Sequence, residues 1–162
     1  MRTINLFVVH CSATREDCTL SPEALDVMHR RRGFNGTGYH YYIRKDGTLY
    51  LTRSLERIGA HAKGFNAHSI GICYEGGLDC RGRPADTRTP EQRAALRLLV
   101  HQLLEKFPDC RVCGHRDLSP DKNGNGEIEP EEWMKACPCF DAEEEFKELV
   151  AEGTVETQSK LN

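Results

Sequence analysis

The sequence lacks several features that would assign it to common classes of protein. No apolar run approaches the roughly 20 residues that a membrane-spanning helix needs, so we expect no membrane partner. Basic residues are not in excess: the 162 residues carry a formal net charge of −3, and nucleic acid is therefore not an expected partner. Internal repeats and low-complexity segments are also absent. The length suits one domain with a sizeable core.

The N-terminus lacks the long apolar core of a secretory signal. Its apolar run, Ile4–Val9, is short and is interrupted by Asn5. We therefore expect the chain to be made in the cytoplasm without a signal peptide, and to reach an extracellular target only after release or export. In that reducing compartment most of the eight cysteines should be free thiols. We also expect a monomer.

Strand-like and helix-like segments alternate along the chain. Buried strands are predicted at Ile4–Val9, from Ser69 onward and at Arg111–Cys113. A hairpin that turns at Asp46-Gly47 breaks the alternation, with arms at Tyr39–Arg44 and Thr48–Arg53. This order predicts an α/β fold: a single domain with a central mixed β-sheet flanked by helices.

Two helices have clear N-terminal signals. Ser21 followed by Pro22 predicts one helix start, and Thr89 with Gln92 predicts another through a capping box. A final acidic helix is expected at residues 141–150, which gives a domain of residues 1–150. Residues 151–162 are polar, and we expect them to form a frayed tail.

Three side chains suggest a metal site. His10 and His115 follow predicted strands, and Cys137 lies in the segment KACPCFD. Two neutral imidazoles and a thiolate form a plausible zinc set that leaves a fourth position for water. Their wide spacing in the sequence is weak evidence by itself, since a lone histidine is more often structural.

Six ordered segments strengthen this interpretation. They are FVVHCSAT, GTGYHYYIRKDGT, IGAHAKGFNAHSIGICYEGG, TPEQ, GHRD and KACPCFD. In content and order the chain resembles the zinc-dependent N-acetylmuramoyl-L-alanine amidases of the phage-lysozyme type, which are related to the peptidoglycan recognition proteins. The resemblance spans residues 4–141. It implies hydrolysis of the amide between N-acetylmuramic acid and L-alanine in peptidoglycan, leading to lysis of the cell wall.

The resemblance also implies roles for individual residues. It makes His10, His115 and Cys137 the zinc ligands, and it makes Tyr39 and Lys135 catalytic. The substrate groove is implied to include three further polar residues of one loop: His61, Lys63 and Asn66.

These residue types suit amide hydrolysis. Zinc lowers the pKa of bound water to about 7 and polarises the substrate carbonyl. Because a thiolate ligand reduces the charge of the site, positive charge from Lys135 and a hydrogen bond from Tyr39 should help to stabilise an oxyanion. The proton acceptor stays open between Tyr39, the zinc-bound hydroxide and a group on the substrate. We expect His40 to face away from Tyr39, and His29, His68 and His101 to have no catalytic role.

A different reading is a recognition module that binds muropeptides without cutting them. Relatives of that kind typically lack the cysteine ligand, whereas this chain has Cys137. The biological setting is left open between a phage endolysin, a secreted antibacterial effector and a cytoplasmic wall-recycling amidase.

The segment DKNGNGEIEPEE, residues 121–132, fits the calcium-loop pattern at every fixed position. The calcium ligands would be the side chains of Asp121, Asn123, Asn125 and Glu132 and the carbonyl of Glu127. A plain polar turn has the same composition. Because a sensor needs paired loops, a calcium-responsive regulator is disfavoured. If calcium binds, we expect it to brace the segment that carries Lys135 and Cys137.

A four-cysteine structural zinc site is disfavoured as well. Cys110 and Cys113 have C-x-x-C spacing, but Cys137 and Cys139 have C-x-C spacing, which is unusual for a zinc knuckle.

Overall fold

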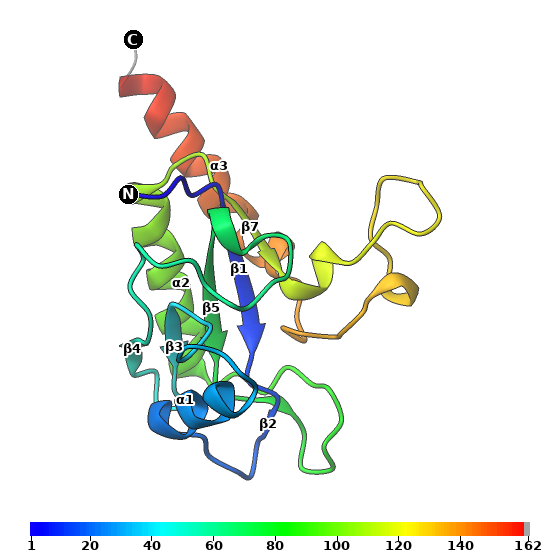
Figure 1. The fold of residues 1–162 in the computed structure, drawn as a ribbon. Coiled ribbons are helices and arrows are strands. Elements are labelled where there is room, and N and C mark those ends of the chain that lie inside the picture. The colour runs from blue at the N-terminus through cyan, green and yellow to red at the C-terminus, as the bar shows by residue number, and fades with distance from the viewer. Residues whose placement is uncertain (161–162) are drawn as a thin grey trace.

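A five-stranded mixed sheet forms the centre of the protein, whose computed structural model describes residues 1–160 (Figure 1). The strand order is β4-β3-β5-β1-β7, and only β3 and β4 pair in an antiparallel sense. The strands are β1 (Leu6–Cys11), β3 (Tyr41–Ile43), β4 (Leu49–Leu51), β5 (Ser69–Tyr74) and β7 (Arg111–Gly114). The predicted mixed sheet is therefore confirmed. A second parallel pair, β2 (Thr14–Arg15) and β6 (Gly77–Leu78), was not predicted.

The helices begin where the sequence places them. They are α1 (Pro22–Arg31), α2 (Pro90–Lys106) and α3 (Ala142–Lys160), with short 3-10 turns η1 (Asn66–His68), η2 (His115–Leu118) and η3 (Pro130–Glu132). The Ser21 side chain accepts a hydrogen bond from the backbone N of Ala24, and Thr89 and Gln92 form the predicted capping box. None of these helices in residues 1–160 is long and apolar enough to cross a membrane.

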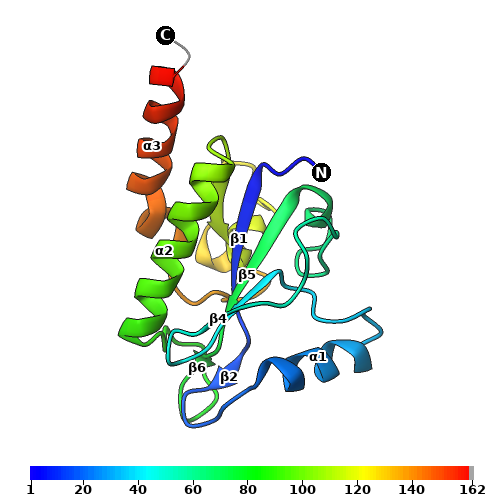
Figure 2. The same ribbon diagram turned by 90° about the vertical axis from the view of Figure 1, so that its left-hand side faces the viewer.

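Successive side chains along the strands point to opposite faces of the sheet. One face packs into the main core, and the other, called the functional face below, carries His10. Phe7, Val9, Ile70 and Ile72 point into the main core, which α2 and α3 cover (Figure 2). Leu6 and Val8 belong to a cluster on the opposite face. On that opposite face α1 packs through Leu25 against Tyr42 and Cys73. His10 follows Val8 by two residues, so strand geometry places its side chain on the same face.

Two predicted boundaries need correction. The strand β3 starts at Tyr41, so Tyr39 and His40 lie in the segment before it. The helix α3 does not fray at Ala151 but continues to Lys160. Gly153 lies against the end of α2, where a Cβ built on it would come within 4.0 Å of Pro108 and Leu104. Packing against α2 therefore supports helical turns that the polar composition alone did not predict.

A buried carboxylate joins three parts of the chain. Glu75 follows β5 directly, and its side chain is 1% exposed. It accepts hydrogen bonds from the backbone N of Leu20 at 2.6 Å and of Lys45 at 3.0 Å, and it pairs with Arg44 at 3.1 Å. Burial by itself would raise the pKa of Glu75, but the Arg44 side chain and the two backbone donors hold that pKa below its ordinary value.

We expect Glu75→Ala to lower the free energy of unfolding at pH 7 by about 3 to 5 kcal/mol, because it leaves buried donors and Arg44 without a partner. Since the folded pKa lies below the unfolded one, the contribution is complete above the unfolded value and is lost as the pH falls through the folded value. Urea unfolding at several pH values measures this difference. The exposed Glu105→Ala is the control, and equal stability of the two variants would contradict the prediction.

Candidate active site

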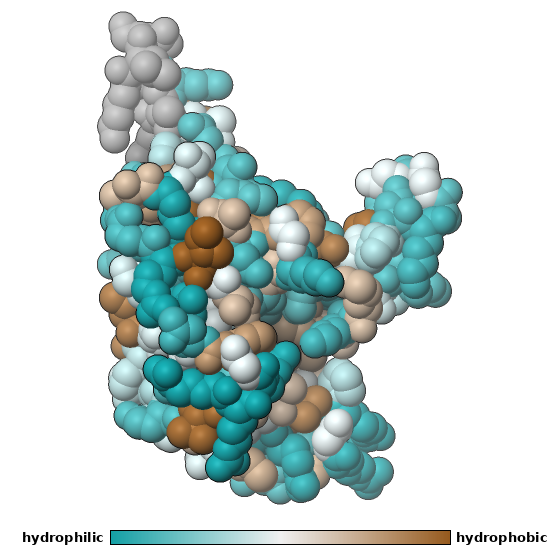
Figure 3. Space-filling model, viewed as in Figure 1, coloured by the Kyte–Doolittle hydropathy of each residue, from teal (hydrophilic) through white to brown (hydrophobic). Residues whose placement is uncertain are grey.

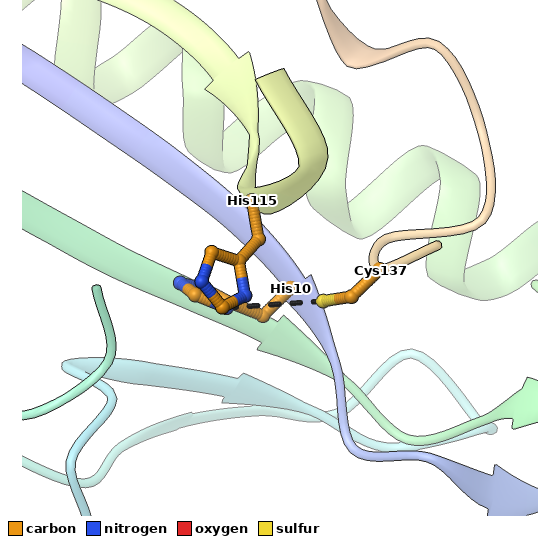
Figure 4. Close-up of side chains that lie close together, drawn as sticks. All are labelled: His10, His115 and Cys137. Atoms are coloured by element: carbon orange, nitrogen blue, oxygen red, sulfur yellow. Dashed lines mark hydrogen bonds between the residues drawn. The ribbon is translucent and has the colours of Figure 1, made fainter. Parts of the chain in front are cut away.

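Three donor side chains converge on the functional face of the sheet. His10 comes from β1, His115 begins η2 directly after β7, and Cys137 lies just before α3 (Figure 4). Their donor atoms all lie within 4.8 Å of one another, and His10 Nδ1 is 3.8 Å from Cys137 Sγ. Tetrahedral zinc, at about 2.1 Å from nitrogen and 2.3 Å from sulfur, would hold such atoms about 3.6 Å apart. The geometry therefore fits zinc.

The electrostatics of the site favour metal-binding forms of these side chains. Burial lowers the pKa of both His10 and His115, and the nearby charge of Lys135 lowers each further. Neutral imidazoles keep a lone pair for a metal. The backbone N of Cys11 donates to Cys137 Sγ at 3.2 Å, a contact that stabilises a thiolate. Three protein ligands leave a fourth coordination position for water or substrate.

A cleft of about 670 Å³ surrounds the three donors. Every zinc, catalytic and substrate residue expected from the sequence lines it: His10, Tyr39, His61, Lys63, Asn66, His115, Lys135 and Cys137. Segments far apart in the chain thus meet at one site, as the ordered motifs implied. In Figure 3 the segment that follows η2 and includes η3 projects from the body, and we call this segment the arm.

Comparison with known proteins identifies the family. Residues 1–139 match the family model described as N-acetylmuramoyl-L-alanine amidase (Amidase_2). The chain belongs to this family. It is 36% identical over 135 residues to an endolysin of Enterobacteria phage K11, covering 83% of this chain and 80% of that protein.

Solved structures agree with this assignment. The amidase LysC from Clostridium intestinale URNW aligns with a TM-score of 0.67 and 29% identity, covering 93% of this chain and 85% of that one. Drosophila PGRP-LB shares the fold, with a TM-score of 0.65 and 23% identity over 91% of this chain and 81% of its own. The protein is thus an amidase that acts on the muramyl–alanine amide of peptidoglycan.

Tyr39 lies deep in the amidase cleft. Its ring centroid is 5.0 Å from that of His10 and 5.3 Å from that of His29. Burial raises the pKa of Tyr39 well above its ordinary value. The hydroxyl therefore keeps its proton and is a hydrogen-bond donor. Lys135, in contrast, is exposed at the rim.

The three predicted substrate residues differ in their surroundings. Lys63 is exposed beside the cleft. The Asn66 side-chain oxygen accepts hydrogen bonds from the backbone N of His61 and of Ala62, both at 2.9 Å, so Asn66 shapes its own loop. His61 borders the cleft and also contacts His10, with His61 Nδ1 2.9 Å from His10 Nε2. Contact of these residues with substrate stays a prediction.

His29, for which no catalytic role is expected, lies in helix α1 and borders the cleft. It is buried, lines the cleft and accepts a hydrogen bond from the backbone N of Gly38 at 2.8 Å. Its spacing of four from Leu25 puts both on the buried face of α1, a signal present in the sequence. The cleft also includes Arg32, Phe34 and Met134, which sequence reasoning did not single out.

The remaining histidines and cysteines are not part of the three-donor group His10, His115 and Cys137. His40 is fully buried, accepts a hydrogen bond from the backbone N of Gly71 and is not among the residues that line the cleft. All eight cysteines are free thiols. Cys110 and Cys113 belong to two different core clusters. Among residues 1–160, only His10, His115 and Cys137 form a three-residue group able to hold a metal.

The side chains at the proposed calcium positions accept hydrogen bonds from the backbone of their own loop, residues 121–132. The Asp121 carboxylate accepts from the backbone N of Gly124 and of Gly126, and the amide oxygens of Asn123 and Asn125 each accept from the residue two positions on. Glu132 is buried and accepts from three backbone N atoms of the loop, those of Lys122, Asn123 and Glu129. Glu127 donates its backbone N to Asn125. Calcium binding stays a prediction that neither this geometry nor the comparisons support.

Protein contacts join the arm to the segments that carry His115 and Cys137. The Arg116 guanidinium stacks 4.0 Å over the Trp133 ring. The backbone N of Arg116 donates to the Cys137 carbonyl at 2.8 Å, and that of Met134 donates to Ser119 Oγ at 3.1 Å. The arm is thereby fastened to η2, the turn that begins with His115.

We expect Trp133→Ala to loosen this connection. Loss of the stacked ring should lower the free energy of unfolding by about 1 to 3 kcal/mol and reduce zinc affinity, because Cys137 is then held less rigidly beside His115. Calorimetry and a chelator competition measure the two effects. Trp133→Phe should retain part of both. Zinc affinity unchanged in Trp133→Ala would show that the stack does not position Cys137.

Proposed function

We propose that the amidase is zinc-dependent and that His10, His115 and Cys137 hold the ion. The convergence of these three donors in one cleft is the observation that carries the proposal. When bound, zinc supplies an activated water and polarises the scissile carbonyl. The donor set of two imidazoles and one thiolate suits zinc better than magnesium or calcium, which prefer oxygen ligands.

The other cleft residues complete the chemistry. Tyr39 lies beside His10, and its hydroxyl would donate a hydrogen bond to the attacking water or to the oxyanion. Lys135 places a positive charge close enough to lower the pKa of both histidines, and it offsets negative charge that develops on the carbonyl oxygen. Lys63 at the rim is suited to contact the substrate.

The alternative is a module that binds peptidoglycan without cutting it. The complete ligand set, including Cys137, favours the enzyme. Purified peptidoglycan incubated with the protein and zinc decides between them. Mass spectrometry should detect stem peptides with a free L-alanine amine, whereas binding without released peptide would favour the module.

For the biological setting, we propose an endolysin that acts on the cell wall after release from the cytoplasm. Its likeness to the phage K11 endolysin supports this choice over a secreted effector or a recycling amidase. Expression with and without a membrane-permeabilising protein tests it. Lysis should require the second protein, and lysis by the amidase alone would argue for an independent export route.

Lys135→Met keeps the length of the side chain but removes its charge. We expect kcat to fall on the order of 10²- to 10³-fold, the effect typical of losing one oxyanion-stabilising group, while zinc affinity is retained. Steady-state kinetics on a soluble muropeptide measure the loss. Lys122→Met, on the exposed arm, is the matched control. Equal kcat in the two variants would remove Lys135 from the reaction.

A further inference from the structure

The His61 side chain lies between His10 and a serine of β5. His61 Nδ1 is 2.9 Å from His10 Nε2, and His61 Nε2 is 3.2 Å from Ser69 Oγ. The rings of His10 and His61 meet edge to face, with centroids 5.0 Å apart. These contacts form a chain of three polar groups that ends on the metal-binding imidazole.

A metal held between His10 and Cys137 would fix the direction of the hydrogen bonds along these three groups. His10 Nδ1 faces Cys137 Sγ at 3.8 Å, so Nδ1 is the nitrogen that points toward the metal and must be bare. The proton of neutral His10 then sits on Nε2 and is donated to His61 Nδ1. His61 in turn carries its own proton on Nε2 and donates it to Ser69 Oγ. Metal-binding histidines almost always have such an acceptor on their second nitrogen, and it fixes both tautomer and ring orientation.

The backbone around His61 leaves a space shaped for its ring. A Cβ placed on Gly71 would lie 2.6 Å from the ring, and a Cβ on Gly59 would lie 2.7 Å from it. Any larger residue at either position would displace the imidazole. The side-chain oxygen of Asn66 holds the backbone of His61 and of Ala62. The ring is therefore confined to a position from which it reaches both His10 and Ser69.

We propose that His61 is a positioning residue of the metal centre, which with Ser69 orients His10 so that its bare Nδ1 faces the ion. The inference rests on the proposed zinc site. It replaces the substrate-binding role expected for His61 from the sequence. His61 acts through His10 and need not touch the substrate.

Zinc affinity, measured by competition with a chromophoric chelator, tests the proposal. His61→Phe fills the space without an acceptor, and its zinc Kd should rise about 10- to 100-fold, the range typical of losing such a partner. His61→Asn places an amide oxygen where Nδ1 was and should restore most of the affinity. His101→Phe, on the exposed side of α2, should bind zinc like the wild type.

Nitrogen-15 NMR of the wild type gives a second readout that does not depend on a folded variant. The proposal requires a bare Nδ1 and a protonated Nε2 on His61 when zinc is bound. A proton on His61 Nδ1 would overturn it. So would wild-type zinc affinity in His61→Phe, with only KM raised. Absence of zinc binding by the wild type would instead overturn the proposed zinc site itself.

Discussion

Replacing Cys137 by alanine is expected to reduce amidase activity by at least about 10³-fold while the fold survives. If the proposed ligand set holds, the variant would retain only two neutral ligands, His10 and His115, and would lose the thiolate that neutralises part of the metal charge. Without zinc to activate the carbonyl and the water, the activation free energy would rise by several kcal/mol. That rise corresponds to a rate loss of this factor or more. Release of stem peptides from peptidoglycan measures activity, and elemental analysis measures bound zinc. Both should fall together.

The fold should tolerate this change because Cys137 is only partly buried and lies at the margin of the main core. Cys137 only borders that core, whereas the residues from α2 and α3 fill it. Circular dichroism should therefore give a spectrum like that of the wild type. Cys18→Ala, at an exposed free thiol, is the matched control and should keep full activity. Undiminished hydrolysis by Cys137→Ala would remove this cysteine from the catalytic centre.

Removal of the metal is expected to have an effect of the same size. Dialysis against a zinc chelator should reduce activity to background, and one equivalent of zinc should restore it. Magnesium and calcium should not, since imidazole and thiolate donors bind them poorly. Zinc should also raise the melting temperature, because it binds the folded chain in preference to the unfolded one.

The outcome depends on showing that the metal is gone. Full hydrolysis by protein whose zinc content is negligible by elemental analysis would contradict the proposed mechanism. Recovery with calcium alone would instead point to the loop at residues 121–132. The same titration can follow thermal stability with calcium in wild type and Asp121→Ala, which tests the calcium prediction separately.

Local signals in the sequence predicted much of the framework. Ser21 and Thr89 start helices through hydrogen bonds within one turn, so short-range chemistry is enough to locate them. The buried strand that carries His10 is similarly visible as an apolar run. The extension of α3 to Lys160 was missed because it depends on contact between Gly153 and the end of α2, which no local pattern records.

The active site could be predicted only in part. The family motifs identified His10, His115 and Cys137, although their spacing alone gives no reason for them to meet. The orientation of His61 was not predictable, because it depends on Gly59 and Gly71 leaving space for the ring. The position of His29 beside the cleft was not predicted, although its spacing of four from Leu25 indicates burial.

The zinc centre is tested most directly by anomalous X-ray diffraction at the zinc edge on crystals of the zinc-loaded amidase. One strong peak is expected, bounded by His10 Nδ1, the His115 ring and Cys137 Sγ. Zinc should lie about 2.1 Å from nitrogen and about 2.3 Å from sulfur. If crystals of fully active amidase show no peak in the cleft, or show the peak elsewhere in the chain, the proposed zinc centre is contradicted.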